Sequence, residues 1–255
     1  TVYFVIAAGF TANAFEVSAT EGGAAINTSG TQSGVQTVTQ NTTVRGTGAG
    51  TTELVSVTGV LLNANSITNG PAAQRGTYVG SIRTNASSQV DMIFGGAGGA
   101  GGEGTVLGMW NMYNRRLLNL FNFDTTNSWA YTTLTWRLRN AAASTILNKI
   151  KFLIGVRGDG LSAINAAQAG NTSANIAALV SIGLNSTSGP TLGSTQGRGA
   201  GASTVVSNLI AVHSSMAPLG FNYLAPLEES VASGTQTWEG DSGTAVPTSG
   251  FTMQT

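Results

Sequence analysis

The sequence predicts an all-β protein, an antiparallel β-sandwich or jelly-roll-like domain that is preceded by a small β module. Three observations lead to this prediction. Of the 255 residues, 41% are hydrophobic, which is enough to bury a core. Thr, Val, Ile and aromatic residues, which favour strands, alternate with polar residues over short segments. The 35 glycines, together with many Asn and Ser residues, supply tight connections between those strands.

Residues 1–45 are predicted to form the small module. Residues 2–6 (VYFVI) and 14–18 (AFEVS) have the pattern of short strands, and residues 35–44 alternate Val and Thr with Gln and Asn. The run RGTGAGTT at 45–52 breaks that pattern and is the best candidate for a boundary. Because the sequence opens on Thr1, we expect this module to lack its first part.

Residues 53–255 are predicted to form one larger β-sandwich or jelly-roll-like domain. The glycine-rich run 95–104 is predicted to be a loop or a close approach of backbones, and 161–169, which is rich in Ala, is the only segment with helical spacing. Residues 110–120 fit neither period. Together with the strands of the small module, more than ten strands are predicted in the whole chain. Those of the larger domain are 53–62, 77–84, 124–139, 146–156, 176–184, 204–213, 221–228, 236–239 and 251–253.

Charged residues are scarce and balanced, which excludes several kinds of partner. They make up 9% of the chain, against about 25% in an ordinary soluble domain. The 11 basic and 11 acidic residues cancel, so no basic field is available to hold nucleic acid. No apolar run is as long as a membrane helix requires, so we expect no membrane insertion. The absence of Cys excludes disulfides, and one His with few acids makes a metal site or a bound cofactor unexpected.

A serine-protease triad is one catalytic constellation that the sequence allows us to test. The sequence GDSG at 240–243 resembles the nucleophile loop of trypsin-like proteases, and His213 is the only histidine. A triad also needs an acid that orients the histidine. Between His213 and Ser242 the only Asp is Asp241, beside the serine itself. We therefore interpret this segment as a turn and His213 as a residue at the end of a strand.

Paired carboxylates are the second constellation, because glycosidases need two of them about 5–10 Å apart. Glu228 and Glu229 are adjacent, so on a strand they point to opposite faces. Glu239 and Asp241 are two residues apart and could share a face, although a solvated pair at a strand edge is the simpler interpretation. We expect no catalytic residue in the chain and therefore no enzymatic activity.

Two short motifs and five aromatic residues complete the candidate sites. The run 95–104 lacks the Lys and Ser or Thr of a phosphate-binding loop, and the tripeptide RGD at 157–159 arises easily as a turn. The aromatic residues lie in strand-like segments, which favours core or inter-subunit positions over a platform for stacking sugars. For Trp129 and Trp136 we expect burial. The five candidate ligand or interface aromatics are Trp110, Tyr113, Trp129, Trp136 and Trp238.

Eight segments, taken in order, have a recognisable pattern. They are TVYFV at 1–5, AFEVS at 14–18, GGAAI at 22–26, TYVGSIRT at 77–84, WNMYNR at 110–115, TNSWAYTTLTWR at 126–137, YLAPLEES at 223–230 and ASGTQTWEGD at 232–241. Together they resemble a family of virion structural proteins of tailed bacteriophages, and the opening resembles a short β module of phage fibres and appendages. Two stretches depart from the family's pattern: the long glycine-rich run 95–104 and the apolar LLNLFNF at 117–123.

This resemblance implies a β-rich, trimeric component on the exterior of the virion, in contact with other virion proteins. It does not choose between a tail fibre or spike and a head decoration or fibre. A homo-oligomer is also expected from the composition, because few charges are available to keep strand edges apart. Two alternatives remain open: a module for host attachment that recognises a surface glycan, and a glycan depolymerase on the same scaffold.

Overall fold

The computed structural model describes most of the larger domain and a part of the N-terminal module. The chain divides into two units, Thr1–Val38 and Thr39–Thr255. The predicted boundary at 45–52 and the predicted strand at 35–44 lie outside the described residues. The structure describes residues 4–11, 14–18, 24, 54–67, 69–98, 104–113, 115–141, 148–156, 158–173, 176–201, 206–231, 233–241, 243 and 249–255.

In the N-terminal unit, two strands form an antiparallel hairpin. Strand β1 (Phe4–Thr11) pairs with β2 (Ala14–Ser18), with Phe4 opposite Ser18 and Ile6 opposite Glu16. The predicted second strand has the bounds of β2. The first strand was predicted at 2–6, and its described part continues beyond residue 6 to Thr11, with an irregular register between Ile6 and Thr11.

The second unit opens with two small sheets. Strand β3 (Leu54–Val57) pairs with β4 (Val60–Asn63), so the single strand predicted at 53–62 is a hairpin that turns at Thr58 and Gly59. Strand β5 (Gly80–Ile82) pairs with β9 (Met109–Asn111). The predicted strand at 77–84 is therefore shorter, and the ambiguous segment 110–120 contains the end of β9.

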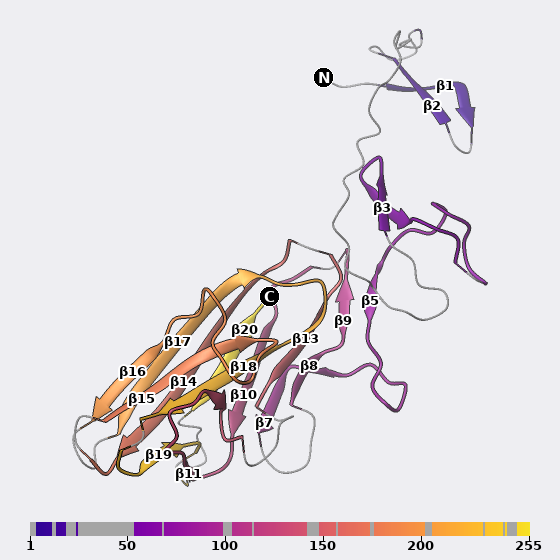
Figure 1. Cartoon of the computed structure of the whole chain (residues 1–255). Helices are drawn as coiled ribbons and strands as arrows, with labels where there is room; N and C mark the ends of the chain where they lie inside the picture. The colour runs from indigo at the N-terminus through magenta and orange to yellow at the C-terminus, as the bar shows by residue number, and fades with distance from the viewer. Residues whose placement is uncertain are drawn as a thin grey trace. The chain divides into compact units, whose positions relative to one another are not determined.

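The main body consists of two sheets that pack face to face as a β-sandwich (Figure 1). The first, called the β14 sheet, has the strand order β11-β19-β14-β20-β10-β7, and β17 pairs with the other edge of β14. Its strands are β7 (Gly95–Gly98), β10 (Asn119–Asp124), β11 (Ser128–Ala130), β14 (Gly160–Asn171), β17 (Ser207–Met216), β19 (Gln236–Glu239) and β20 (Gly250–Gln254).

The second sheet, called the β18 sheet, has the order β16-β15-β18-β13-β8-β6, and β12 also pairs with β18. Most pairs in both sheets are antiparallel, whereas β7 runs parallel to β10 and β8 parallel to β13. The strands of the second sheet are β6 (Met92–Ile93), β8 (Thr105–Leu107), β12 (Arg137–Leu138), β13 (Ile150–Ile154), β15 (Ile176–Leu184), β16 (Gly197–Gly201) and β18 (Gly220–Ser230).

One side of the sandwich is closed where β16 meets β17, so the two sheets curl into a half-barrel. The backbone N–H of Thr195 donates to the carbonyl of Val212 over 2.8 Å, and Ser194 forms a bridge with His213. A side chain at Gly197 would collide with the backbone of Ile210. Glycine at this position is therefore what allows the two strands to approach.

The core lies between the sheets and contains small and large side chains in alternation. From β14, Leu161, Ala163, Ala167 and Ala169 point inward and are buried. The opposing and flanking strands contribute larger groups, of which Phe152, Trp238 and Phe251 are fully buried. The alanines of β14 let the sheets approach closely, and the larger residues fill the remaining space.

The predicted helix at 161–169 is wrong, because this segment is the centre of β14. Its residues alternate between buried and exposed along the whole strand, as a period of two requires. Alanine has the highest intrinsic helix propensity, but propensity is a weak determinant, and pairing with β17 on one edge and with β19 and β20 on the other overrides it.

Two further expectations need correction. The glycine-rich run 95–104 was predicted to be a loop or a close approach of backbones, and the loop prediction is wrong for Gly95–Gly98, which form β7 and pair with β10, while residues 99–103 lie outside the described residues. The long strand predicted at 124–139 is two short strands, β11 and β12, and residues 131–136 between them are not in a strand. The remaining predicted strands at 146–156, 176–184, 204–213, 221–228, 236–239 and 251–253 are confirmed as β13, β15, β17, β18, β19 and β20.

All of the described residues lie in strands, turns or irregular segments, and they contain no helix. In particular, the described part of the chain offers no long apolar helix of the kind that crosses a membrane.

Replacing the fully buried Trp238 by Ala should lower the free energy of unfolding by about 3–5 kcal/mol, because a large cavity opens between the sheets. The exposed Tyr113 provides the control, and Tyr113→Ala should change stability by less than about 0.5 kcal/mol. Urea unfolding of both variants beside the wild type measures this. Equal stability of the two variants would contradict the assigned core.

Candidate functional site

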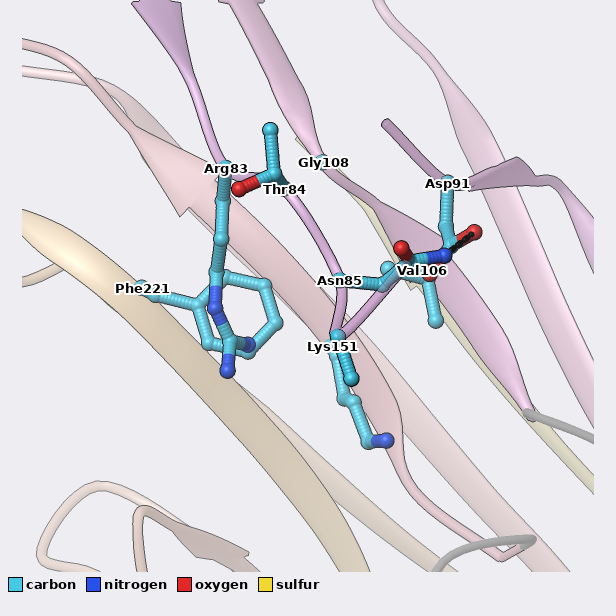
Figure 2. Close-up of a pocket in the computed structure, with 9 residues that line it drawn as sticks. Arg83, Thr84, Asn85, Asp91, Val106, Gly108, Lys151 and Phe221 are labelled. Atoms are coloured by element: carbon cyan, nitrogen blue, oxygen red, sulfur yellow. Dashed lines mark hydrogen bonds between the residues drawn. The ribbon is translucent and has the colours of Figure 1, made fainter. Parts of the chain in front are cut away.

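A cavity of about 150 Å³ opens on the outer side of the β18 sheet. Along β13, Ile150 and Phe152 point into the core, so Lys151 between them points out into this cavity. Figure 2 shows the side chains that surround it. The cavity is lined by Arg83, Thr84, Asn85, Ala86, Asp91, Val106, Gly108, Lys151 and Phe221.

The loop between β5 and β6 provides one wall of the cavity and is held by its own hydrogen bonds. The Oδ1 atom of Asn85 accepts from the backbone N–H groups of Ser87 and Gln89 at 2.9 and 3.0 Å. The Nδ2 atom of Asn85 donates to Oδ1 of Asp91 over 2.9 Å (Figure 2). Backbone bonds from Arg83 to Gly108 and from Gly108 to Asp91 fasten the loop to the chain between β8 and β9. The wall is therefore preorganised.

Cations and aromatic rings gather on the same outer face. The guanidinium of Arg83 lies 3.5 Å from the centroid of the Phe221 ring, and Figure 2 shows the two stacked. The ammonium of Lys149 lies 4.6 Å from the centroid of the Tyr223 ring. We call Arg83, Lys149, Lys151, Phe221 and Tyr223 the basic–aromatic face. It holds both lysines of a chain that has only 11 basic residues.

The charges of this face are only partly compensated. Neither Arg83 nor Lys149 forms an ion pair with a carboxylate among the described residues. Burial lowers the pKa of Lys149, and the neighbouring charge of Lys151 lowers the pKa further. Among the residues that line the cavity, Asp91 is the one that carries a carboxylate. The arrangement can attract an anion and offer it hydrogen-bond donors.

The five aromatic residues singled out in the sequence do not come together. Trp110 is buried on β9, stacks on Tyr78 with 6.0 Å between ring centroids, and donates from Nε1 to Asp159 over 2.6 Å. Trp238 is fully buried in the core, and Tyr113 is exposed. The core interpretation therefore holds for Trp110 and Trp238, whose faces are covered by protein.

The expectation that Trp129 and Trp136 are buried needs correction, because both are half-buried. Trp129 lies opposite Trp238 in the β11–β19 pair, at a sheet edge, and its Nε1 reaches both carboxylate oxygens of Glu228 at 3.0 and 3.1 Å. Trp136 lies outside the strands and packs against a small cluster of Leu138, Ala225 and Leu227. Short edge strands cover less of a ring than the centre of a sheet does.

A buried carboxylate, Glu228, lies at the centre of a polar network between the sheets. Glu228 and Glu229 do point to opposite faces of β18, and Glu228 is fully buried. Its carboxylate accepts from Arg137 Nε at 2.8 Å and from the backbone N–H of Asn140 at 3.2 Å, in addition to Trp129. Burial raises the pKa of Glu228 to about 7, although Arg137, Trp129 and Asn140 act in the opposite direction.

Arg139 is the cation at the centre of this network. It is fully buried, and its Nη1 donates to Asn165 Oδ1 and to the carbonyl of Ala166, both at 3.2 Å. Burial lowers the pKa of Arg139, while the charges of Asp124 and Glu228 raise it. Asp124 is itself buried and accepts from Asn140 and Asn148 at 2.9 Å. The Nε and Nη2 atoms of Arg139 are buried without a hydrogen-bond partner, so the charges of Asp124 and Glu228 provide most of the compensation of this cation.

Within the described part of the chain, the ring of His213 has no acidic hydrogen-bond partner of the kind that a protease triad needs. His213 is buried, and its ring nitrogens contact the hydroxyls of Ser194 and Ser215, each at 2.9 Å. Burial lowers the pKa of His213. Ser242 of the GDSG segment and Arg157 of the RGD tripeptide lie outside the described residues. Gly95–Gly98 form a strand, which is not the loop that a phosphate cradle needs.

Glu239 and Asp241, the candidate acidic pair, have different surroundings. Glu239 ends β19 and lines a different cavity, of about 220 Å³, beside Asn171, Val206 and Thr237. Asp241 follows the strand, and its Oδ1 accepts from the backbone N–H of Gly243 at 2.9 Å. As for metals, the described residues contain no group of three His, Asp or Glu side chains that could hold an ion.

Sequence reasoning missed Arg83, Asn85, Asp91 and Phe221 as site residues. They come from two segments far apart in the chain, the loop between β5 and β6 and the start of β18, which only the fold brings together. One signal was present: Lys149 and Lys151 are two residues apart at an apolar strand, which places both on one face. Comparison with protein-family models and with curated proteins finds no significant match for this chain.

Replacing Glu228 by Gln should remove a pH dependence of stability. The pKa of Glu228 is about 7 in the folded state and 4.5 ordinarily. The stability that this carboxyl contributes in its protonated form is therefore fully present below about pH 4.5. As the pH rises from about 4.5 to 7, Glu228 releases its proton in the unfolded chain but keeps it in the folded one. The free energy of unfolding of the wild type should therefore fall by about 3 kcal/mol relative to that of Glu228→Gln.

Urea unfolding of both proteins at intervals from pH 4.5 to 8 measures that difference. His213, whose pKa is lowered, acts in the opposite direction but equally in both proteins, so the difference between the two curves isolates Glu228. If the free energies of unfolding of the two proteins ran parallel over the whole pH range, the raised pKa of Glu228 would be contradicted.

Proposed function

We propose that the chain is a non-enzymatic structural protein that assembles with copies of itself on the exterior of a tailed-bacteriophage virion. The observation that carries the proposal is the outer face of the β14 sheet, which is apolar in its middle and carries no charge on four adjacent strands, β17, β14, β20 and β10. We call the outward-pointing residues of these strands the neutral face.

The register of the strands places apolar residues of the neutral face in two adjacent rows. In the first row, Val212 lies opposite Ile164, Ile164 opposite Thr252, and Thr252 opposite Phe121. The second row runs in the same way through Ile210, Ala166, Gly250 and Phe123. Val212, Ile164, Phe121 and Ile210 are each more than 40% exposed. Contiguous apolar surface of this kind marks an interaction site.

A second copy of the same chain is the partner that fits this face best. Without a charged residue, the neutral face offers nothing to complement a charged partner, and it does not repel its own copy. The whole chain has a formal net charge of zero, so copies meet no long-range repulsion either. Small residues in the second row, Ala166 and Gly250, allow close approach of two sheets.

The neutral face is also shaped by a glycine strand at its edge. The ring of Phe121 lies over Gly95 of β7, where a Cβ atom would collide with it. Phe121 and Phe123 stack with 6.4 Å between centroids and 9° between their planes. The two rings therefore lie against the sheet and widen the apolar surface toward β7.

The placement on a virion rests on the resemblance of the ordered segments to virion proteins of tailed phages. That resemblance also supports three copies per assembly, contacts with other virion proteins and a position as fibre, spike or head decoration. A closed rotational arrangement would cover the neutral face in every copy and prevent open-ended stacking.

The absence of enzymatic activity is part of the proposal. Three cavities among the described residues are each lined by a single carboxylate, namely Asp91, Asp159 or Glu239. Glycoside hydrolysis needs two carboxylates across one cleft. The depolymerase alternative would require the purified chain to release reducing ends from a polysaccharide, which we do not expect.

Placing a charge in the apolar rows should dissociate the oligomer. Ile210 is 60% exposed, so Ile210→Lys should fold normally while it forces lysines of adjacent copies into an apolar contact. Leu192, 96% exposed in the connection between β15 and β16, gives the matched control Leu192→Lys. Size-exclusion chromatography with light scattering should show the wild type and Leu192→Lys as oligomers and Ile210→Lys near 25.8 kDa. An unchanged oligomer in Ile210→Lys would reject this face as the interface.

A further inference from the structure

We propose that the cavity on the basic–aromatic face binds an acidic saccharide, a sugar unit that carries a carboxylate, as part of a longer glycan. This site lies on the outer side of the β18 sheet, whereas the neutral face lies on the outer side of the β14 sheet. The inference goes beyond the proposed assembly function, and both faces can act at once. It rests on three features: cations held in place, a carboxylate with one oxygen that accepts no hydrogen bond from the described residues, and the size of the cavity.

Arg83 is the first feature, because it is preorganised to bind a carboxylate. Its guanidinium stacks on the Phe221 ring at 3.5 Å, and its backbone N–H is held by Gly108 at 2.8 Å. Stacking occupies a face of the planar group and leaves the N–H donors at its edge directed outward. A guanidinium in this state can hold a carboxylate with two parallel hydrogen bonds.

The two lysines add positive charge around Arg83. Lys151 lines the cavity, and Lys149 lies two residues earlier on the same face, against Tyr223. Burial, and after it the nearby charge of Lys151, lowers the pKa of Lys149, as expected for two like charges on one face. An anion bound between them would relieve this repulsion, so the face favours a negatively charged ligand.

Asp91 distinguishes an acidic sugar from a simple anion. Its Oδ1 accepts from Asn85, while its Oδ2 accepts no hydrogen bond from the described residues. A carboxylate beside the bound group repels phosphate or sulfate but accepts hydrogen bonds from hydroxyl groups. A ligand with a carboxylate at one side and hydroxyls at the other matches Arg83 and Asp91 together.

The size of the cavity limits the ligand to about one sugar unit. Its volume of about 150 Å³ is below the range of about 300–1,000 Å³ that encloses a drug-sized molecule. A saccharide that is part of a polymer needs only one unit to enter such a site, since its neighbours continue along the surface. Repetition of the site in an oligomer would then strengthen the attachment by avidity.

The test is calorimetric titration of the full chain with four polymers that carry sugar carboxylates: polygalacturonate, alginate, hyaluronate and polysialic acid. Neutral dextran and inorganic phosphate are the reference probes. We expect binding of at least one acidic polymer and of neither reference probe. Binding to none of the four polymers, or binding of phosphate as tight as that of the polymers, would overturn the proposal.

Three substitutions locate the site. Arg83→Gln should weaken polymer binding by about tenfold or more, since it removes a bidentate charge-assisted contact. Arg198→Gln, which removes an exposed cation from β16 of the same sheet, is the matched control and should leave binding unchanged. Equal weakening by both would indicate unspecific attraction and reject the cavity.

Asp91→Asn gives the sharpest result, because it keeps an oxygen for Asn85 but replaces the charge and the second acceptor. It should weaken binding of the acidic polymer while it strengthens binding of phosphate. Strengthened binding of both ligands would show a plain anion site and contradict the saccharide. Light scattering of each variant should show the wild-type oligomer, which separates a failure of this site from a failure of assembly.

Discussion

Burial of Arg139 between the two sheets is the constraint on which the rest of the structure depends. An unpaired charge in a core costs several kcal/mol, so the surrounding chain must bring acceptors and counter-charges to it. Asp124 comes from the end of β10 in the β14 sheet, and Glu228 comes from β18 in the other sheet. Asn165 of β14 adds a bond to Arg139 and donates to the carbonyls of Ser181 and Leu227 across the sandwich. Apolar packing alone is not directional, whereas these bonds fix how one sheet lies on the other.

The two outer faces of the sandwich differ strongly in their charge. The β14 sheet presents a neutral surface with rows of Ile, Val and Phe, whose covering by another copy is our explanation for the low charge of the chain. The outer side of the β18 sheet is lined by Arg83 and both lysines, with Arg83 stacked on Phe221 and Lys149 placed beside Tyr223. In the proposed assembly, one side of the domain would bind its copies while the other stays available to a ligand.

The strands that the sequence predicted best are those whose pattern is decided locally. Residues 176–184 and 236–239 coincide with β15 and β19, because β-branched and aromatic residues alternate there between turn residues. The central strand β14 was predicted as a helix, since its alanines have a high helix propensity and only pairing with the neighbouring strands overrides it. The cavity was not predicted, because its walls come from segments around Arg83, Val106, Lys151 and Phe221, and their meeting depends on the complete fold. The spacing of Lys149 and Lys151 was the only part of it visible in the chain.

Sedimentation equilibrium of the purified wild-type chain tests the central claim, self-assembly, most directly. The account predicts an oligomer that persists at concentrations on the order of tens of micromolar, and the resemblance to phage proteins predicts a mass of three times 25.8 kDa. A soluble species of 25.8 kDa over the whole concentration range would contradict it, because the neutral face would then be stable in water without a second copy to cover it.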